Sequence, residues 1–362
     1  GDRFLFLYRR RQWNPAMGVW MGWERKRGKL SELNRLLRGA QDTSFMAPCT
    51  VTQDVRFVIT LDADTRLLRD TVRRLVGKIA HPLNRPHFDA AQGRVTQGYG
   101  ILQPRVTPAL PVGNEGSLYQ QINASHGGID AYASAISDVY QDLFAEGSFT
   151  GKGIYDVDAF SAALAGRVPD NTMLSHDLFE GNFARAALVS DIEVVEDFPA
   201  RHDIAARRQH RWVRGDWQLL PWLTRQGPGQ AGGQQGAMSA LGRWKIIDNM
   251  RRSLTAPLTL LALGWLLPFP GAAAWTALVL AMLALPYLLP LPFALLPGRA
   301  GITAHSHLAA LAGDARIAAA RIALDITFLP DTALRMADAI LRTGWRLLRS
   351  RRKLLEWMTA AR

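Results

Sequence analysis

A long uncharged stretch constrains this chain more than any other feature. From Ser253 to Gly298 no residue carries a charge. One continuous helix of that length would be about twice as long as the roughly 30 Å hydrocarbon layer of a bilayer. Because Pro268-Phe269-Pro270-Gly271 offers a turn within the stretch, we expect a hairpin of two transmembrane passes. A re-entrant pair also fits the short first arm, and a buried soluble hairpin is the remaining alternative.

Charged flanks predict how this hairpin is oriented. The cations Arg243, Lys245, Arg251 and Arg252 precede the stretch, and Arg299 follows it. Since a hairpin returns both flanks to one side, the positive-inside rule makes that side cytoplasmic. We assign residues 236–300 to a membrane-entry helix and hairpin, and 301–362 to amphipathic, membrane-associated helices. Their basic end, Arg342–Lys353, is expected at anionic headgroups, although a solvated helix face explains it equally well.

Residues 1–235 show the mixed pattern of an α/β domain. Strand-like runs lie at Phe4–Tyr8, Phe57–Leu61 and Ile192–Val195, and helical patterns lie at Leu30–Leu37 and Asp70–Ile79. Gln226–Gly236 is rich in Gly and Gln and is expected to be a loop. Because the chain opens within a strand-like run and without Met, we expect a fragment of a longer protein.

Composition narrows the class of partner. The 362 residues carry a net charge of +12, with an isoelectric point near 10.4. This balance suits nucleic acid, an anionic membrane surface or phosphorylated substrates. The single cysteine, Cys49, excludes a disulfide framework and a cysteine-rich zinc site. Eleven Trp favour membrane interfaces and sugar-binding surfaces.

Two carboxylates, Asp62 and Asp64, end the strand-like run at Phe57–Leu61. Side chains at i and i+2 of an extended segment point the same way, so these two can converge on one point. Like charges at that distance favour a cation beside them. Oxygen ligands suit Mg²⁺ or Mn²⁺, which would carry a diphosphate on its open face. On spacing alone, a solvated turn after a strand is the alternative.

A lone carboxylate and a glycine-rich loop are further candidates for a site. Ser175-His176-Asp177 is not a hydrolase triad, because adjacent residues do not reach the hydrogen-bonded line that a triad needs. Asp177 stands at the start of a predicted helix, as a general base or as a helix cap. Glu146–Gly153 has no Ser or Thr after Lys152 and therefore fails the phosphate-loop pattern. We expect it to be a flexible loop near the active site.

Cations and indoles alternate between Arg207 and Trp217. Arg208 and Arg211 can neutralise phosphate charge. Trp212 and Trp217 can offer flat faces to a sugar ring. Read alone, the segment fits an amphipathic helix at a membrane interface better than it fits a site for phosphate and sugar.

The order of these motifs resembles that of the processive family-two-like glycosyltransferases, the relatives of cellulose and hyaluronan synthases. In that family Asp-x-Asp binds metal and nucleotide diphosphate, a Thr-Glu-Asp motif supplies the base, and (Gln/Arg)-x-x-Arg-Trp lies near the acceptor. The matching residues are Asp62, Asp64, Asp177, Arg208, Arg211 and Trp212. Ser175-His176 departs from Thr-Glu, while the base position is kept.

Longer runs resemble the glycosyltransferase region of bacterial cyclic β-1,2-glucan synthases. They are Trp20–Leu30, Asn34–Gly39, Gly98–Arg105, Ser137–Phe144, His210–Trp222 and Leu354–Trp357. The resemblance implies a GT-A-like domain over 1–235 that is incomplete at its N-terminus. It also implies inverting transfer of glucose from UDP-glucose to a growing β-1,2-glucan, in a multi-pass protein of the bacterial inner membrane with a cytoplasmic catalytic domain.

The resemblance assigns roles to individual residues. Asp62 and Asp64 would hold Mg²⁺ or Mn²⁺, and Asp177 would take the proton from the acceptor 2-hydroxyl. The nucleotide-sugar side would comprise Lys29, Asn34, Arg208 and Arg211 together with the acidic pair. The acceptor side would comprise Trp212 and Trp217.

Other functions compete with this interpretation. A non-catalytic, membrane-anchored scaffold could bind glucan through its Trp-rich surface, and a processive glycosyltransferase could make another polysaccharide. Charge alone suggests nucleic-acid binding, but the cations cluster beside tryptophans and the uncharged stretch. We therefore expect UDP-glucose, a growing glucan and inner-membrane lipids as partners, and no nucleic acid.

Overall fold

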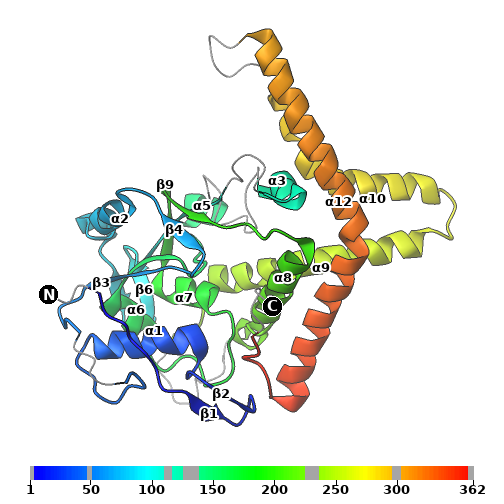
Figure 1. The fold of residues 1–362 in the computed structure, drawn as a ribbon. Coiled ribbons are helices and arrows are strands. Elements are labelled where there is room, and N and C mark those ends of the chain that lie inside the picture. Colours follow the sequence, from blue (N-terminus) through cyan, green and yellow to red (C-terminus); the bar gives the residue numbers. More distant parts are fainter. Residues whose placement is uncertain are drawn as a thin grey trace.

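The computed structural model describes residues 4–46, 51–109, 116–124, 138–224, 236–295 and 303–357. A mixed α/β body occupies one side of the molecule, and long helices cross and project from the other side (Figure 1). The predicted α/β class is confirmed. Cys49 and most of the predicted loop at Gln226–Gly236 lie outside the described residues.

A five-stranded sheet forms the centre of the body. Its order is β3 (Phe57–Thr60), β8 (Gly153–Asp156), β7 (Ile101–Pro108), β9 (Ala186–Glu196) and β4 (Thr65–Leu67). The pair β7 and β9 is parallel, and the other pairs are antiparallel. Two small antiparallel ribbons accompany it, β1 (Gln12–Asn14) with β2 (Val19–Met21) and β5 (His87–Asp89) with β6 (Arg94–Gln97).

The described helices surround this sheet and form the projecting part. The α-helices are α1 (Arg25–Leu36), α2 (Thr71–Ile79), α3 (Leu118–Ala124), α5 (Val139–Phe144), α6 (Val157–Leu164), α7 (Asp177–Ala184), α8 (His202–Trp217), α9 (Ala240–Leu266), α10 (Ala272–Leu288), α11 (Pro290–Phe293) and α12 (Ala304–Trp345). Short 3₁₀ turns lie at η1 (Pro82–Asn84) and η2 (Leu220–Leu223), and a π-helical turn, η3 (Arg346–Ser350), follows α12.

Alternation along the strands separates two apolar layers. Successive side chains of a strand face opposite sides of the sheet. Ile101 therefore joins the larger core with α6 and α7. Its neighbour Leu102 joins Leu75 and Ile79 of α2 on the other face. Apolar side chains thus cover both faces of the sheet at this level.

Most predicted elements of the body are present. Phe57–Leu61 contains β3, Ile192–Val195 lies in β9, and both predicted helices correspond to α1 and α2. The strand predicted at Phe4–Tyr8 is wrong. Phe4 and Phe6 are 97% and 91% exposed. Only the following residue, Arg9, makes a bridge, to Phe45. At the end of this run the Tyr8 carbonyl accepts a hydrogen bond from the Met46 N–H at 2.8 Å, but in the described residues no strand forms over Phe4–Tyr8.

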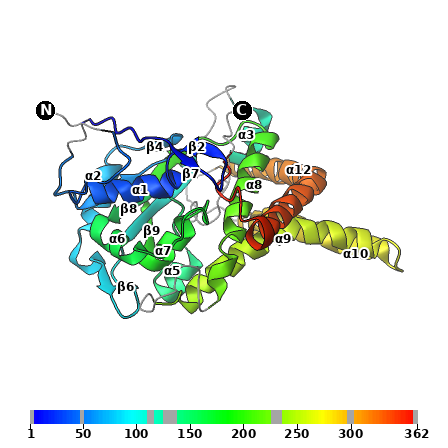
Figure 2. The same ribbon diagram turned by 90° about the horizontal axis from the view of Figure 1, so that it is seen from below.

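The uncharged stretch forms a helical hairpin. α9 starts within the body, ends at Leu266, and is followed by a turn and α10. This hairpin extends away from the α/β body in both views (Figures 1 and 2). Its surface exposes large apolar side chains such as Leu261, Trp265 and Met282. A helical hairpin turning at Pro268–Gly271 is thus confirmed.

Within the described residues, one helix is long and apolar enough to cross a membrane, Ala272–Phe293. The first arm does not qualify, because the early turns of α9 carry cations such as Arg251 and Arg252. Some of these turns are buried in the body, as Lys245 and Ile246 show. The structure therefore supports membrane association through one span, and the second pass stays a prediction.

The helical prediction for 303–362 holds through α12 and η3, and residues 351–357 are not helical. α12 crosses α8 and α9 (Figure 1). Its buried residues Met336 and Ala339 pack with Val213 of α8. Two histidines of α8 also pair with α12, His202 with Asp331 and His210 with Asp338. The charges that recur along α12 thus partly serve helix packing.

Candidate active site

The connection between β3 and β4 crosses one end of the sheet. β3 lies at one edge and β4 at the other, so the residues between them must span the intervening strands. Thr60 pairs with Gly153, and Thr65 pairs with Glu196. Asp62 and Asp64 are consequently held above the ends of β7 and β9, next to Glu196. Strand ends in α/β folds commonly position chemistry in this way.

These three carboxylates form what we call the acid cluster, Asp62, Asp64 and Glu196. One oxygen from each lies within 4.8 Å of the others. The predicted convergence of Asp62 and Asp64 is therefore seen, with a third member from the last residue of β9. Their side chains are 36%, 41% and 12% exposed. All the donors are hard oxygens, the set that suits Mg²⁺ or Mn²⁺.

Three cations offset the charge of the acid cluster. Lys26 Nζ lies 2.7 Å from Asp62 Oδ1. Lys152 Nζ lies 3.3 Å from Asp62 Oδ2 and 3.0 Å from Glu196 Oε2. On the far side, Arg208 contacts Glu196 and lies 3.6 Å from Asp64 Oδ2. Like-charge repulsion within the cluster is thus compensated by side chains of α1, the glycine loop and α8.

The pKa of the Asp62 carboxyl reflects the cations around it. Burial alone would raise the pKa of the Asp62 carboxyl, but the ammonium groups of Lys26 and Lys152 outweigh burial and hold that pKa below its ordinary value. At Lys26, burial would lower the pKa, but Asp177 and Asp62 raise it above the ordinary value. Lys26 therefore lies within the field of both predicted functional carboxylates.

A cavity of about 650 Å³ joins these groups. Its lining includes Asp62 and Glu196 of the acid cluster and Asp177 at the start of α7. The glycine loop contributes Ser148, Phe149, Thr150 and Lys152. The loop predicted near an active site therefore lies on the same cavity as the predicted base.

Asp177 occupies a confined position on this cavity. Its side chain is 28% exposed. Its Oδ1 atom is buried and accepts no hydrogen bond from the described residues. Gly151, with φ +85°, lies so close that a Cβ there would meet the Asp177 carboxylate at 2.7 to 2.8 Å. A left-handed glycine is needed here both for the turn and for the approach.

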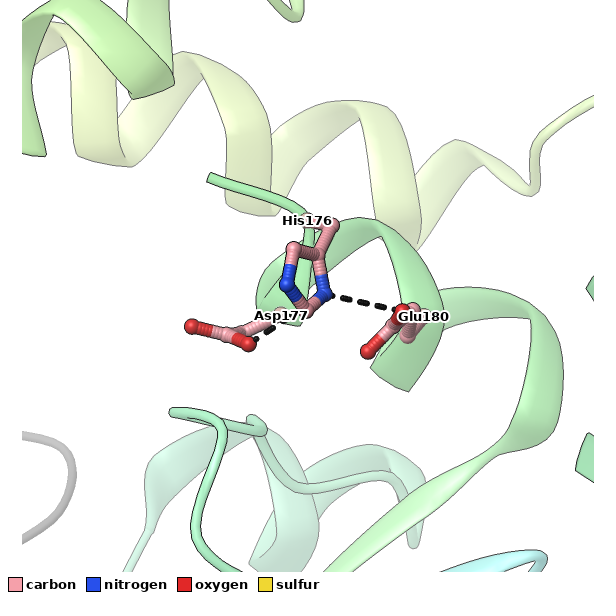
Figure 3. Close-up of side chains that lie close together, drawn as sticks. All are labelled: His176, Asp177 and Glu180. Atoms are coloured by element: carbon pink, nitrogen blue, oxygen red, sulfur yellow. Dashed lines mark ion pairs between the residues drawn. The ribbon is translucent and has the colours of Figure 1, made fainter. Parts of the chain in front are cut away.

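A buried histidine and glutamate lie behind Asp177 (Figure 3). His176 Nδ1 is 2.8 Å from Glu180 Oε1 and 3.5 Å from Asp177 Oδ1. His176 and Glu180 are only 4% and 2% exposed. Burial would lower the pKa of His176, but Glu180 and Asp177 raise it above the ordinary value. Burial raises the pKa of Glu180, and His176 opposes that shift.

The cationic and aromatic motif lies on α8 at the cavity. Arg208, Arg211 and Trp212 all line it. The Arg208 guanidinium lies 5.0 Å from the centre of the Trp212 ring. Arg211 lies 3.9 Å from the centre of the Trp357 ring, contributed by the segment after α12. Burial, with help from Arg208 and Arg214, lowers the pKa of Arg211 to about 10.

The remaining predicted residues divide into two groups. Lys29 lines the cavity, and Asp64 belongs to the acid cluster. Asn34 and Trp217 are not among its lining residues. Asn34 is buried and accepts a hydrogen bond from the Tyr155 hydroxyl at 2.8 Å. Trp217 donates to Ser253 Oγ at 2.9 Å and packs between α8 and its neighbours. The structure thus places these two in the packing rather than on the cavity.

Sequence reasoning missed several members of the site. Glu196 is the last residue of β9, and Asp62 follows β3 by two residues. A carboxylate at the end of a strand-like run could therefore have predicted Glu196 as a member of the site. Lys152 lies in the glycine loop that was singled out, and Lys26 lies in one of the quoted runs. Glu180 offered a local signal, because it lies four residues after His176 at the start of the predicted helix. Trp357 ends another quoted run, but only tertiary packing brings it to the cavity.

Comparison with known proteins agrees with the motifs. No protein-family model matches the chain. The sequence is similar to that of a cyclic glucan synthase, with 51% identity over 363 aligned positions. That protein is the cyclic β-(1,2)-glucan synthase NdvB of Rhizobium meliloti (strain 1021). The alignment covers 99% of this chain and 12% of NdvB. The predicted resemblance to a glucan synthase region is confirmed, for a chain that spans about an eighth of that relative.

Proposed function

We propose that this chain is a GT-A-like glucosyltransferase region that adds glucose from UDP-glucose to a growing β-1,2-glucan with inversion. The observation that carries the proposal is that Asp62 and Glu196 of the acid cluster line the same cavity as Asp177. Similarity to a cyclic glucan synthase supports the class of product. The UDP-glucose donor and the inverting course follow from the resemblance to the glucan synthases, and the carboxylates and cations at the cavity suit a metal-bound diphosphate.

The acid cluster fits a hard divalent cation. Asp62, Asp64 and Glu196 supply only oxygen donors, and they lie close enough to share one ion. When bound there, Mg²⁺ or Mn²⁺ would stabilise negative charge on the departing diphosphate. Lys26 and Lys152, which now neutralise these carboxylates, would then be free to contact phosphate oxygens.

The chain's own residues account for the remaining chemistry. Asp177 would accept the proton of the acceptor hydroxyl while that oxygen bonds to the anomeric carbon and the bond to UDP breaks. One displacement inverts the centre, so no protein nucleophile is required. Arg208 and Arg211 would hold the diphosphate through charge-assisted hydrogen bonds, and Trp212 would stack against a sugar ring.

The hairpin is the basis for the proposed location of the site at the membrane. We propose that α9 and α10 cross the bacterial inner membrane as two passes, with the catalytic domain on the cytoplasmic side. The cations before the hairpin and the basic end of α12 would face the cytoplasmic leaflet and its anionic lipids. UDP-glucose is then available on the side where the cavity lies.

Titration of UDP with and without Mn²⁺ tests the donor half of this proposal. A transferase of this kind should bind UDP more tightly when Mn²⁺ is present. A glucan-binding scaffold should show no metal-linked affinity. Incubation with labelled UDP-sugars in membranes, followed by linkage analysis, tests the product. Linkages other than β-1,2 would point to a transferase for another polysaccharide.

A further inference from the structure

The ion pair behind Asp177 has no part in the proposed reaction so far. His176 directly precedes α7, and Glu180 lies one turn along it, so the side chains meet on one face of the helix. The imidazole Nδ1 lies between two carboxylates at ion-pair distances, 2.8 Å from Glu180 and 3.5 Å from Asp177, without a hydrogen bond of good geometry to either. Figure 3 shows the ring with Asp177 on one side and Glu180 on the other, joined to both by dashed lines that mark the ion pairs.

Asp177 is asymmetric in its surroundings. Oδ1 is buried toward His176, and no described residue donates a hydrogen bond to it. The 28% of the side chain that is exposed must therefore belong largely to the other edge, which carries Oδ2. Gly151 closes off the carboxylate from one side. Consequently one oxygen is left to meet a substrate, and the other faces the imidazole.

The charged and titratable groups around this pair are few. Asp177 and Glu180 come from α7, Lys26 approaches from α1, and the Tyr155 hydroxyl of β8 lies in the field of Glu180. His176 is almost fully buried, so its charge is little screened by solvent. Two carboxylates this close to one ring nitrogen favour a protonated imidazole.

We propose that His176, held by Glu180, is a positioning residue that orients the Asp177 carboxylate for proton transfer. This inference rests on the proposed function. In the step, the acceptor hydroxyl proton goes to Asp177 Oδ2, and the new glycosidic bond replaces the bond to UDP. His176 keeps its own proton throughout, so it acts on the reaction only through Asp177.

The test uses variants that remove charge but keep a polar side chain. In His176→Asn the amide can donate to the neighbouring carboxylates, but it carries no charge. In Glu180→Gln the imidazole loses its nearest carboxylate, and burial then favours the neutral ring. The double variant His176→Asn/Glu180→Gln removes both buried charges together, which avoids an unpaired one and protects folding. His202→Asn, in the separate pair with Asp331 on α12, is the matched control.

Transfer from UDP-glucose is measured as kcat and KM for each variant, beside UDP affinity in Mn²⁺. We expect kcat to fall in the single and double variants while the KM for UDP-glucose stays unchanged, because the base is no longer held in place and the donor site is intact. The rate at neutral pH should fall about tenfold. UDP affinity, melting temperature of the double variant and the kcat of His202→Asn should stay as in the parent chain.

Two results separate this inference from the proposed function. If the folded double variant keeps the parent kcat and KM while Asp177→Asn is inactive, the positioning role is overturned and the transferase stands. If the parent chain neither binds UDP with Mn²⁺ nor transfers glucose, the proposed function fails, and the inference fails with it.

Discussion

Two groups of carboxylates meet at the same cavity, which Asp62 and Glu196 line from one group and Asp177 lines from the other. The two groups balance their charge in opposite ways. The acid cluster is open, and the long side chains of Lys26, Lys152 and Arg208 reach it from three elements. Glu180 is buried, and the His176 ring beside it lies between it and Asp177. One group is compensated by flexible side chains, the other by a ring fixed in the core.

This difference separates exchangeable from permanent compensation. A lysine on a flexible stem can leave a carboxylate when a divalent ion arrives. A buried imidazole one helical turn from its partner cannot move without repacking α7. The open group is thus suited to a metal that comes and goes with the donor, and the buried group to holding a base in place. The following experiments test this contrast.

Asp177→Asn should produce the largest effect. General base catalysis is typically worth about 10²–10⁴-fold, and the amide cannot accept the proton. Transfer from UDP-glucose should fall by that factor, while Mn²⁺-dependent UDP binding stays intact, because the acid cluster is unchanged. A variant that transfers nearly as fast as the parent chain would remove Asp177 from the role of base.

Asp64→Ala should weaken metal binding at the acid cluster and leave the buried pair of His176 and Glu180 unchanged. Loss of one metal ligand is expected to reduce Mn²⁺-linked UDP affinity by at least about tenfold. Loss of a residue that only hydrogen-bonds to a metal ligand already lowers metal affinity by about that factor. Calorimetry with UDP at fixed Mn²⁺ measures it. Asp70→Ala, at the exposed start of α2, is the control. Equal affinities in both variants would exclude Asp64 from the metal site.

Lys152→Met tests whether the lysine ammonium competes with the metal for the carboxylates of the acid cluster. Lys152 lies between Asp62 and Glu196 and is largely buried, and Met has a similar shape. Without the ammonium, the affinity for Mn²⁺ alone should rise about threefold or more, because an opposing positive charge is gone. Mn²⁺ binding followed by electron paramagnetic resonance measures this. Weaker binding would show that Lys152 organises the cluster rather than competing for it.

Lys245→Met should give the smallest effect, a change in how the free energy of unfolding depends on pH. Lys245 lies under the glycine loop and donates to the carbonyls of Glu146 and Gly147. Burial lowers its pKa to about 8. The unfolded chain therefore binds one more proton than the folded chain between that pH and about 10.4, so stability gains at most about 1.4 kcal/mol per pH unit there. Lys245→Met should lack this rise in chemical denaturation, and an unchanged slope would contradict it.

Local sequence patterns predicted much of the body and part of the site. Phe57–Leu61 is apolar and ends in two carboxylates, which sufficed to predict a strand with a polar turn. The same reasoning failed at Phe4–Tyr8, because alternation is a local property and pairing needs a neighbouring edge. Arg208, Arg211 and Trp212 were found because their spacing follows one helix.

What the sequence determined alone was the order of chemistry-bearing segments and the uncharged hairpin, since both follow from composition and spacing along the chain. Tertiary structure decided which charges meet. Glu196 joins Asp62 only because β4 pairs with the end of β9, and Lys26 of α1 reaches Asp62 only in the folded chain. Asn34 and Trp217 went into the packing for the same reason. Side-chain convergence depends on contacts between distant segments, which no local pattern encodes.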